Sequence, residues 1–317
     1  MIEFISLVLI SIGIGTVAAI TGISGGAFKT PLLIIVFALT AELASSASLL
    51  SALFVAVVST VVYYRQNPQL IDFHVGILSV VATIPGTYVG IILRTLAAHA
   101  HILRYVFGIV LFPIALELLF TISETKDHRD EMKRFGFSEL SKKKLAAAII
   151  AIFMAGVSAG LLGLGGGTII VPVLSMILRF RMIVAAATSM FTMIFTTSAG
   201  SVINYLYLAQ TDQVITFLYY SLTMGIGMIM GGMIGPRYAT RVNEVLLKRI
   251  FGFLLIFPLV KMINLGQLWL DPGGSNYVLA TIGDVIIWLT ASIPLWIISS
   301  RRLRNGNKET SGRENLQ

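Results

Sequence analysis

Two glycine-rich clusters with the same surroundings lie 141 positions apart in this chain. The first, Gly22-Ile23-Ser24-Gly25-Gly26, ends five positions before Pro31, and the second, Gly163-Leu164-Gly165-Gly166-Gly167, ends five positions before Pro172. Further residues match at the same offset, namely Ala47-Ser48 with Thr188-Ser189, Gly86 with Gly227 and Gly90 with Gly231. The chain therefore contains a duplicated unit, and each copy interrupts an apolar stretch with glycine at the same place. Broken apolar segments at corresponding positions of two halves are typical of the binding site of a membrane transporter.

The composition indicates that most of the chain lies in a membrane. Hydrophobic residues make up 56% of the chain and charged residues 12%, whereas soluble domains carry about 25% charged residues. Apolar runs of about 20 residues, the length needed to cross the hydrocarbon core, follow one another along the sequence, and the short alternating segments of a membrane barrel are absent. The predicted fold class is an all-α polytopic membrane protein with two repeats.

Charge and cysteine content exclude several function classes. Most of the basic residues behind the net charge of +8 lie between the apolar segments, where the orientation bias of membrane proteins accounts for them without nucleic acid. The chain has no cysteine, so disulfides and thiolate-bound metals are excluded. Its four histidines lack metal-ligand spacing, and no buried pair of carboxylates is evident. We therefore predict no enzyme activity, no metal and no cofactor.

The pattern of apolar and polar stretches divides the chain into five parts. We expect repeat 1 over 1–120, a charged cytoplasmic loop over 121–144 and repeat 2 over 145–265. An extra C-terminal transmembrane helix follows over 266–300, and then a cytoplasmic tail over 301–317 whose last seven residues resemble an expression-tag remnant. The first residues lack the basic start of a cleaved signal peptide, so the first apolar segment is expected to be retained.

Two apolar segments, 27–40 and 168–179, are short for a full crossing, and each directly follows a glycine cluster. The simplest geometry is a re-entrant hairpin, in which a helix enters the membrane, breaks at the glycines and is followed by a half-helix that returns to the side of entry. Non-helical backbone at this depth is tolerated only where protein or water covers it. The sequence therefore predicts two broken hairpins, one in each repeat.

Basic residues between the segments predict the orientation. The 121–144 loop and the tail with Arg301 are basic and should be cytoplasmic, which places the N-terminus outside. Most other loops agree, whereas Arg94 and Arg104 lie on the outer side against the rule. Repeat 1 then begins outside and repeat 2 begins inside, so that the repeats are inverted about an axis in the membrane plane.

The two glycine clusters are the candidate binding site. A helix N-terminus carries unsatisfied N–H groups and about half a positive charge, which suits an anion, and two inverted copies would bring two such termini together. The alternative is close helix packing, because small residues recur four apart. We favour packing for Gly86, Gly90, Gly227 and Gly231, and binding for the clusters, because Pro31 and Pro172 mark a break in each helix. The predicted substrate-binding residues are Ser24, Gly25, Gly26, Lys29, Ser48, Gly165, Gly166, Gly167, Thr188 and Ser189.

Several polar residues leave two interpretations open. Ser48, Thr188 and Ser189 suit either hydrogen bonds to an oxyanion or hydrogen bonds between helices. Lys29 could pair with an anionic substrate or extend to the membrane surface. Glu117 and Lys261 lie near segment ends, which favours an interfacial position over a proton relay. Asp284 is an intramembrane acid, a functional hypothesis by default, but its segment has no counterpart in the other half.

Two halves with Gly-rich turns followed by Pro, Thr-Ser shortly after the second turn, and a basic central loop resemble the TauE/SafE family. The resemblance covers about residues 5–265 and rests on Gly163-Leu164-Gly165-Gly166-Gly167 up to Pro172, with Thr188-Ser189; Ser24 departs from it, because the second copy has Gly165 there. It implies a transporter in the bacterial inner membrane for sulfite, sulfonates such as sulfoacetate, or thiosulfate.

Together these observations predict alternating-access transport of a small anion, with one repeat rocking against the other. An anion channel with the same half-helix site, a permease for a small carboxylate, and a receptor acting through the 121–144 loop are the alternatives. The expected partners are the anionic substrate and membrane lipid but no nucleic acid, and a homo-oligomer is compatible with the sequence.

Overall fold

The computed structural model describes residues 2–95, 142–242, 244–263, 265–273, 276, 279–294 and 297. Every regular element in these ranges is helical, and they contain no strand. The described residues form two compact units, unit 1 up to Val242 and unit 2 from Glu244 onward. The last part of the predicted repeat 1, residues 96–120 with Glu117, and nearly all of the predicted 121–144 loop lie outside the described residues.

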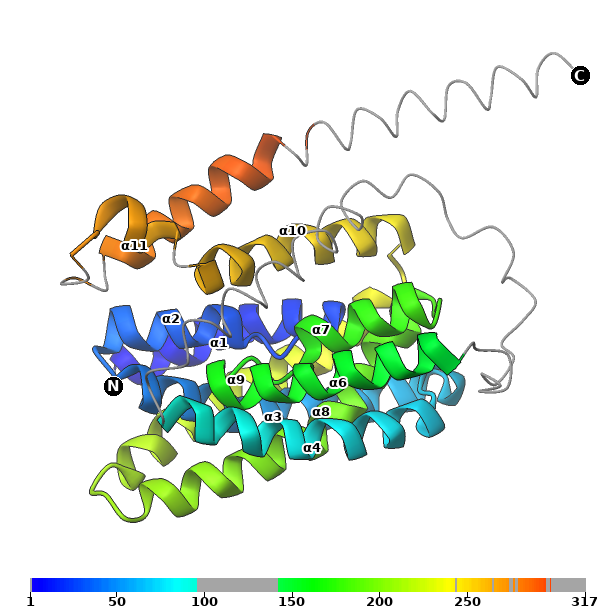
Figure 1. Cartoon of the computed structure of the whole chain (residues 1–317), viewed down its shortest axis with the longest axis horizontal. Helices are drawn as coiled ribbons and strands as arrows, with labels where there is room; N and C mark the ends of the chain where they lie inside the picture. The colour runs from blue at the N-terminus through cyan, green and yellow to red at the C-terminus, as the bar shows by residue number, and fades with distance from the viewer. Residues whose placement is uncertain are drawn as a thin grey trace, which may run out of the picture. The chain divides into compact units, whose positions relative to one another are not determined.

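Unit 1 contains the two glycine clusters and the long apolar helices. These are α1 (Ile2–Thr21), α2 (Gly26–Phe37), α3 (Ala41–Gln66), α4 (Phe73–Thr95), α6 (Lys142–Leu162), α7 (Gly167–Pro172), α8 (Met182–Leu208) and α9 (Val214–Ala239), with a 3-10 turn η1 (Pro68–Leu70) and a π-helical turn η4 (Val173–Ile177) that continues α7. The long helices lie alongside one another (Figure 1). Unit 2 contains α10 (Glu244–Ile263), α11 (Leu265–Leu270) and a helix over Leu279–Pro294.

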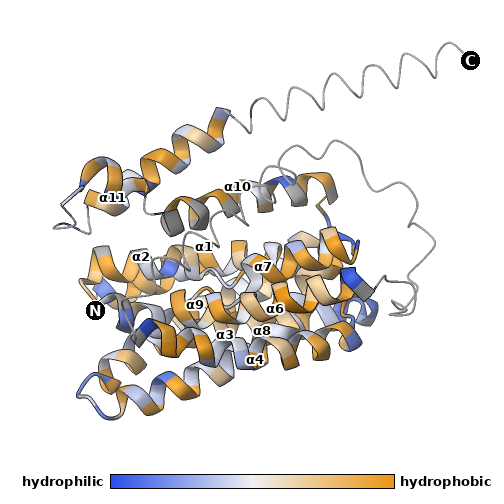
Figure 2. Ribbon diagram, viewed as in Figure 1, coloured by the Kyte–Doolittle hydropathy of each residue, from blue (hydrophilic) through white to orange (hydrophobic). Residues whose placement is uncertain are grey.

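Six of the described helices are long and apolar enough to cross a membrane: α1, α3, α4, α6, α8 and α9. Hydrophobic residues recur along these helices (Figure 2). Helix α3 illustrates why such a segment begins and ends where it does. The Thr40 side chain accepts a hydrogen bond from the Leu43 N–H, while Glu42 in the first turn and Arg65 in the last complement the helix dipole. This architecture agrees with the predicted fold class, an all-α polytopic membrane protein.

The duplication read from the sequence recurs in the backbone. Ala38 after α2 and Arg179 after η4, again 141 positions apart, both adopt a left-handed conformation, with φ of 51° and 58°. The Leu39 N–H donates to the Leu33 carbonyl at 3.3 Å, and the Phe180 N–H donates to the Leu174 carbonyl at 2.9 Å. In both cases the donor lies six residues after its acceptor, one residue further than in the six-to-one hydrogen bond of a Schellman motif. Both half-helices therefore end in the same turn, although neither has glycine there.

Helix packing exchanges elements between the two copies. The first helix of copy 1, α1, packs on α9 of copy 2, and the first helix of copy 2, α6, packs in the same way on α4 of copy 1. Glycines make these contacts close: a Cβ on Gly227 would lie 2.4 Å from the Val8 carbonyl oxygen, and one on Gly86 would lie 2.3 Å from that of Phe153. Gly231 and Gly90 approach α1 and α6 equally closely. The prediction that these four glycines serve helix packing is confirmed.

Candidate functional site

The two glycine clusters meet in the interior of unit 1. A Cβ on Gly26 would lie 2.2 Å from the carbonyl oxygen of Gly163, and one on Gly167 would lie 2.3 Å from that of Gly22. These two contacts are equivalent, because each pairs a glycine of one copy with a glycine of the other at the same offset. No side chain at position 26 or 167 fits between the backbones, so the approach requires glycine at these two positions. The structure therefore brings the two predicted turns into direct contact.

Positive φ angles explain why the clusters are rich in glycine. In the first cluster two glycines have φ above zero, Gly22 at 78° and Gly25 at 71°. In the second cluster Gly163, Gly165 and Gly166 have φ of 71°, 65° and 85°. Residues with a Cβ adopt this conformation at a steric cost. Each helix is thereby broken, and the chain is turned into the half-helix that follows.

The two half-helices begin at the turns and present backbone donors there. In α2 the first intrahelical hydrogen bonds run from the Phe28 and Lys29 N–H groups to the Gly25 carbonyl, both at 3.0 Å. In α7 the N–H groups of Ile169 and Ile170 donate to the Gly166 carbonyl. The N–H groups of the preceding residues belong to the helix N-terminus and have no intrahelical acceptor, and that of Gly26 donates to the Ser24 hydroxyl at 3.3 Å. Neither N-cap supplies a side-chain hydrogen bond. Donors arranged in this way can hold an anion.

Serine hydroxyls connect each half to the glycine turn of the other. The Ser48 hydroxyl donates to the Gly163 carbonyl at 3.3 Å, and the Ser189 hydroxyl donates to the Gly22 carbonyl at 3.0 Å. The Ser24 hydroxyl donates to the Leu164 carbonyl. The sequence left two interpretations open for these hydroxyls, hydrogen bonds to an oxyanion or hydrogen bonds between helices. The structure shows hydrogen bonds that join distant segments of the protein. Contact of these hydroxyls with a substrate stays a prediction.

Thr188 has a different role from its neighbour Ser189. Its hydroxyl oxygen accepts a hydrogen bond at 3.1 Å from the N–H of Asp72, just before α4. The Asp72 carboxylate in turn accepts from the N–H groups of His74 and Val75 and caps that helix. The Thr188 side chain is fully buried. In this geometry it fixes the start of α4 against α8.

Lys29, just past the first turn, is fully buried. Its Nζ donates to the Ser48 carbonyl oxygen at 2.8 Å and to the Ser51 hydroxyl at 2.9 Å. The side chain therefore points into the protein beside Ser48 rather than to the membrane surface. These two contacts hold the Lys29 amino group close to the turns, where a buried charge would be costly unless an anion paired it.

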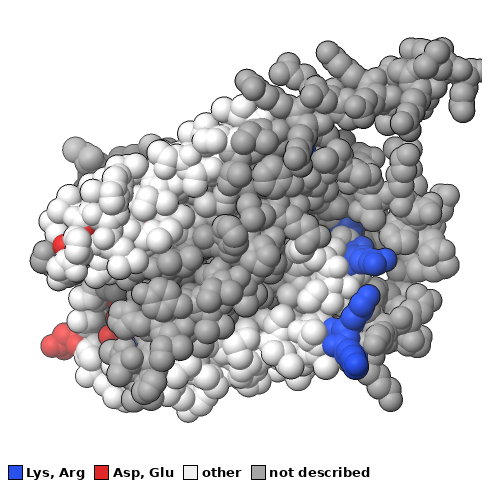
Figure 3. All heavy atoms as spheres, turned by 45° about the horizontal axis from the view of Figure 1, so that its top comes forward, with Lys and Arg blue, Asp and Glu red and all other residues white. Residues whose placement is uncertain are grey.

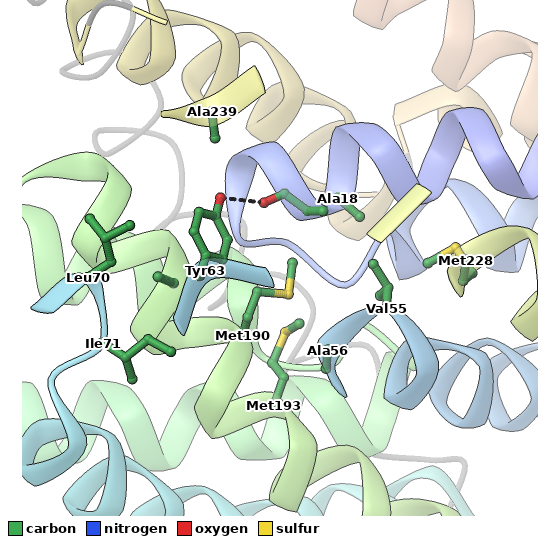
Figure 4. Packing of buried hydrophobic residues seen from close by; sticks show 12 residues of the cluster. Ala18, Val55, Ala56, Tyr63, Leu70, Ile71, Met190, Met193, Met228 and Ala239 are labelled. Carbon is green, nitrogen blue, oxygen red and sulfur yellow. Dashed lines mark hydrogen bonds between the residues drawn. The ribbon is translucent and has the colours of Figure 1, made fainter. Parts of the chain in front are cut away.

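Apolar and aromatic side chains that the sequence motifs did not indicate pack beside the turns (Figure 4). Tyr63 of α3 is fully buried, and its hydroxyl donates to the Ala19 carbonyl of α1 at 2.8 Å. Met190 and Met193 of α8 belong to the same cluster, and the Met193 sulfur would lie 3.0 Å from a Cβ on Gly167. Apolar side chains therefore pack against one side of the polar turns. Only the offset of 141, which pairs Tyr63 with Asn204, could have drawn attention to that tyrosine.

The remaining candidates, Asp284 and Lys261, belong to unit 2. In unit 2 the buried Asp284 carboxylate accepts a hydrogen bond from the Gly266 N–H at 2.7 Å, which gives it a structural role at the start of α11. The Lys261 side chain lies outside the described part of the molecule. Among the described residues, no group of three or more His, Cys, Asp or Glu could hold a metal ion.

Comparison with known proteins gives a family match whose range includes both glycine turns. The family model described as sulfite exporter TauE/SafE matches residues 7–262, nearly the range of the resemblance noted in the sequence. The chain is 27% identical over 226 residues to the probable membrane transporter protein YunE of Bacillus subtilis (strain 168), which covers 65% of this chain and 82% of that protein. No solved structure matches the chain. The chain therefore belongs to the TauE/SafE family and is a membrane transporter.

Proposed function

We propose that the protein moves a small oxyanion across the inner membrane by alternating access, with sulfite, an organosulfonate such as sulfoacetate, or thiosulfate as the substrate. The observation that carries this proposal is the direct contact of the two glycine turns, from which two half-helices begin. Their N-terminal N–H groups supply donors, and the partial charge of two helix termini favours an anion. The name of the matching family, sulfite exporter, supports a sulfur oxyanion.

The residues proposed to bind the anion are the backbone donors of Gly25, Gly26, Gly166 and Gly167, aided by Ser48 and Ser189. Lys29 supplies charge compensation next to Ser48. Three further residues shape the site. Ser24 and Gly165 lie in the turns themselves, and Thr188 holds the start of α4 in place. A site built mainly from neutral donors holds an oxyanion without binding it too tightly for release.

Contacts near the start of α9 support a re-entrant hairpin in the first copy. The rings of Phe37, at the end of α2, and Tyr220 of α9 lie with their centroids 5.4 Å apart. Glu3, at the start of α1, lies close enough to Tyr220 to interact with it electrostatically. Both ends of the α1–α2 segment are therefore near one residue, as expected when the half-helix returns to the side of entry. The equivalent segment of the second copy begins with α6 and ends at Arg179.

The distribution of charge supports the proposed orientation. Exposed basic side chains of unit 1 lie at the ends of α3 and α9, at the start of α6 and just before α8; they are Arg65, Lys143, Lys144, Arg179, Arg181, Arg237 and Arg241. Figure 3 shows exposed Lys and Arg gathered at one end of the face in view. Glu3 and Asp212 lie at the start of α1 and between α8 and α9, the opposite helix ends. By the positive-inside rule the basic end is cytoplasmic and the N-terminus is outside.

Helix packing suggests which bodies move. The glycine-mediated contacts of α1 with α9 and of α4 with α6 leave no space between the backbones, so each pair moves as one body. We therefore expect these mixed pairs, rather than whole repeats, to rock around the turns during alternating access.

Solute counterflow in proteoliposomes tests the proposal. Labelled sulfite, sulfoacetate, thiosulfate, lactate and phosphate are offered to the wild type, to Gly166→Leu and to Gly13→Leu as the matched control. Gly166 has φ of 85° at the turn, whereas a Cβ on Gly13 meets nothing within 4 Å. We expect saturable exchange of a sulfur oxyanion that is lost in Gly166→Leu and kept in Gly13→Leu. Exchange of lactate alone would favour a carboxylate permease, and single-channel current steps would favour a channel.

A further inference from the structure

Arg94, at the end of α4, ties four helices together instead of projecting into a loop. Its Nη1 donates to the Ser45 hydroxyl of α3 at 3.1 Å and to the Gly160 carbonyl of α6 at 3.4 Å. Its Nη2 donates to the Asn204 side-chain oxygen of α8 at 2.6 Å. Arg94 is also a cation that the orientation rule places on the unexpected side. Its enclosure by protein removes that conflict, since the rule concerns charges in loops, and raises the question of what the charge is for.

Donors in this cluster are left over after these contacts are made. Arg94 Nε and Asn204 Nδ2 are both buried, and neither meets an acceptor among the described residues. The hydroxyl of Ser201, one turn earlier on α8, is buried and unpartnered in the same sense. The Asn204 side chain is fully buried. Buried donors are almost always satisfied, and an unsatisfied one is costly. Three adjoining donors, one of them cationic, need an acceptor that the helices do not supply.

The other copy has no such cluster at the equivalent place. At the offset of 141, Asn204 corresponds to Tyr63, Gly160 to Ala19, and Arg94 to Gly235. There a single neutral hydrogen bond, from the Tyr63 hydroxyl to the Ala19 carbonyl, fastens α3 to α1. The tyrosine leaves no donor unused. If the Arg94 cluster served only to fasten helices, a bond of that kind would suffice, so the additional cation and donors point to a ligand.

The cluster adjoins the second glycine turn. Ser45 contacts both, because a Cβ on Gly163 would lie 2.5 Å from the Ser45 carbonyl oxygen and 2.9 Å from its hydroxyl, which also accepts from Arg94. We propose that Arg94 and Asn204 form a second oxyanion subsite, next to the second glycine turn and at the end of unit 1 where α3 begins and α8 ends. The guanidinium Nε–H and the amide Nδ2–H donate to two oxygens of one sulfite or sulfonate group, and Ser201 assists.

This subsite rests on the proposed function, and it makes the two ends of the transport pathway different. An anion bound by Arg94 would lie next to the shared site at the turns. The end with Tyr63, in contrast, is lined by apolar side chains. Glu42, in the first turn of α3, interacts electrostatically with Arg94. It is the described carboxylate that competes with an anion for this charge.

Asn204→Asp tests the subsite with a minimal change of shape. The new carboxylate keeps the acceptor for Arg94 Nη2 but removes the amide donors and repels an anion. We expect the KM for sulfite in counterflow to rise roughly tenfold or more, as for the loss of a charge-assisted hydrogen bond, with a smaller effect on the maximal rate. Asn67→Asp is the matched control. Asn67 Oδ1 accepts from the Gln69 N–H at 2.9 Å near the opposite end of α3, a role that Asp also fills, so its KM should stay unchanged.

Two further measurements keep the result decisive. Arg94→Lys retains the charge but loses the planar fork, and it should raise the KM as well; it replaces Asn204→Asp if that variant does not fold. A KM within twofold of the wild type in folded variants would overturn the subsite and leave the proposed function intact. If the wild type exchanges no anion, the proposed function fails. The increase in unfolding temperature caused by sulfite then tests the subsite independently of transport. Stabilisation lost in Asn204→Asp supports the subsite, and unchanged or absent stabilisation overturns it.

Discussion

Replacing Gly26 by alanine tests whether contact between the two turns holds the site together. The added Cβ would lie 2.2 Å from the Gly163 carbonyl oxygen and 2.9 Å from the Leu164 Cα. Carbon–oxygen contacts in proteins are about 3.3 Å or longer, so the turns must separate by roughly 1 Å. Backbone lies on both sides, and therefore no flexible side chain can absorb the shift.

The cost of this separation has two parts. Overpacking of a tight interior costs about 1–3 kcal/mol, and the weakened hydrogen bond from Ser48 to the Gly163 carbonyl adds about 1 kcal/mol. We expect Gly26→Ala to lose about 2–4 kcal/mol of stability. Because the anion donors also move by roughly 1 Å, transport should fall by more than tenfold, since displacements of that size can cost about a hundredfold in a positioned site.

The assay compares Gly26→Ala with Gly13→Ala in detergent and in proteoliposomes. A Cβ on Gly13, in the middle of α1, meets nothing within 4 Å. The same substitution there should be neutral or stabilise the protein by up to about 1 kcal/mol, because alanine favours helix over glycine. Thermal unfolding and sulfite counterflow are measured for both. Wild-type stability and exchange in Gly26→Ala would refute the claim that the turns are held in contact.

Three other substitutions have defined expected outcomes. Ala38→Gly should raise stability by about 0.5–1 kcal/mol, seen as a higher unfolding temperature in detergent, because glycine accepts the left-handed conformation after α2; an unchanged or lower temperature would contradict this. Tyr63→Phe removes the hydrogen bond to the Ala19 carbonyl and should cost about 1 kcal/mol, so stability equal to the wild type would show that the bond contributes nothing. Asp284→Ala leaves the Gly266 N–H without this acceptor and should cost about 1–3 kcal/mol; if sulfite counterflow by the folded variant were abolished, the structural role would be wrong.

The sequence by itself determined the duplication and the positions of the turns. A repeat at a fixed offset is visible without any structure, and glycines that precede a proline mark a chain break because few other residues adopt positive φ. The structure has left-handed glycines at these positions, with Gly22 and Gly163 as one equivalent pair and Gly25 and Gly166 as another. Apolar segment length likewise determined the long helices, since it follows from membrane thickness alone. The family followed from the same residues.

The tertiary structure alone decided which residues meet. Periodicity and spacing describe one segment at a time, whereas the partner of a side chain depends on how distant segments pack. The exchange by which Ser48 reaches Gly163 and Ser189 reaches Gly22 could not be read from local pattern. The same holds for Arg94, which the sequence placed in a loop. Three other helices, α3, α6 and α8, supply its acceptors, because a partly buried guanidinium requires acceptors from several elements at once, and only the packed fold brings those acceptors together.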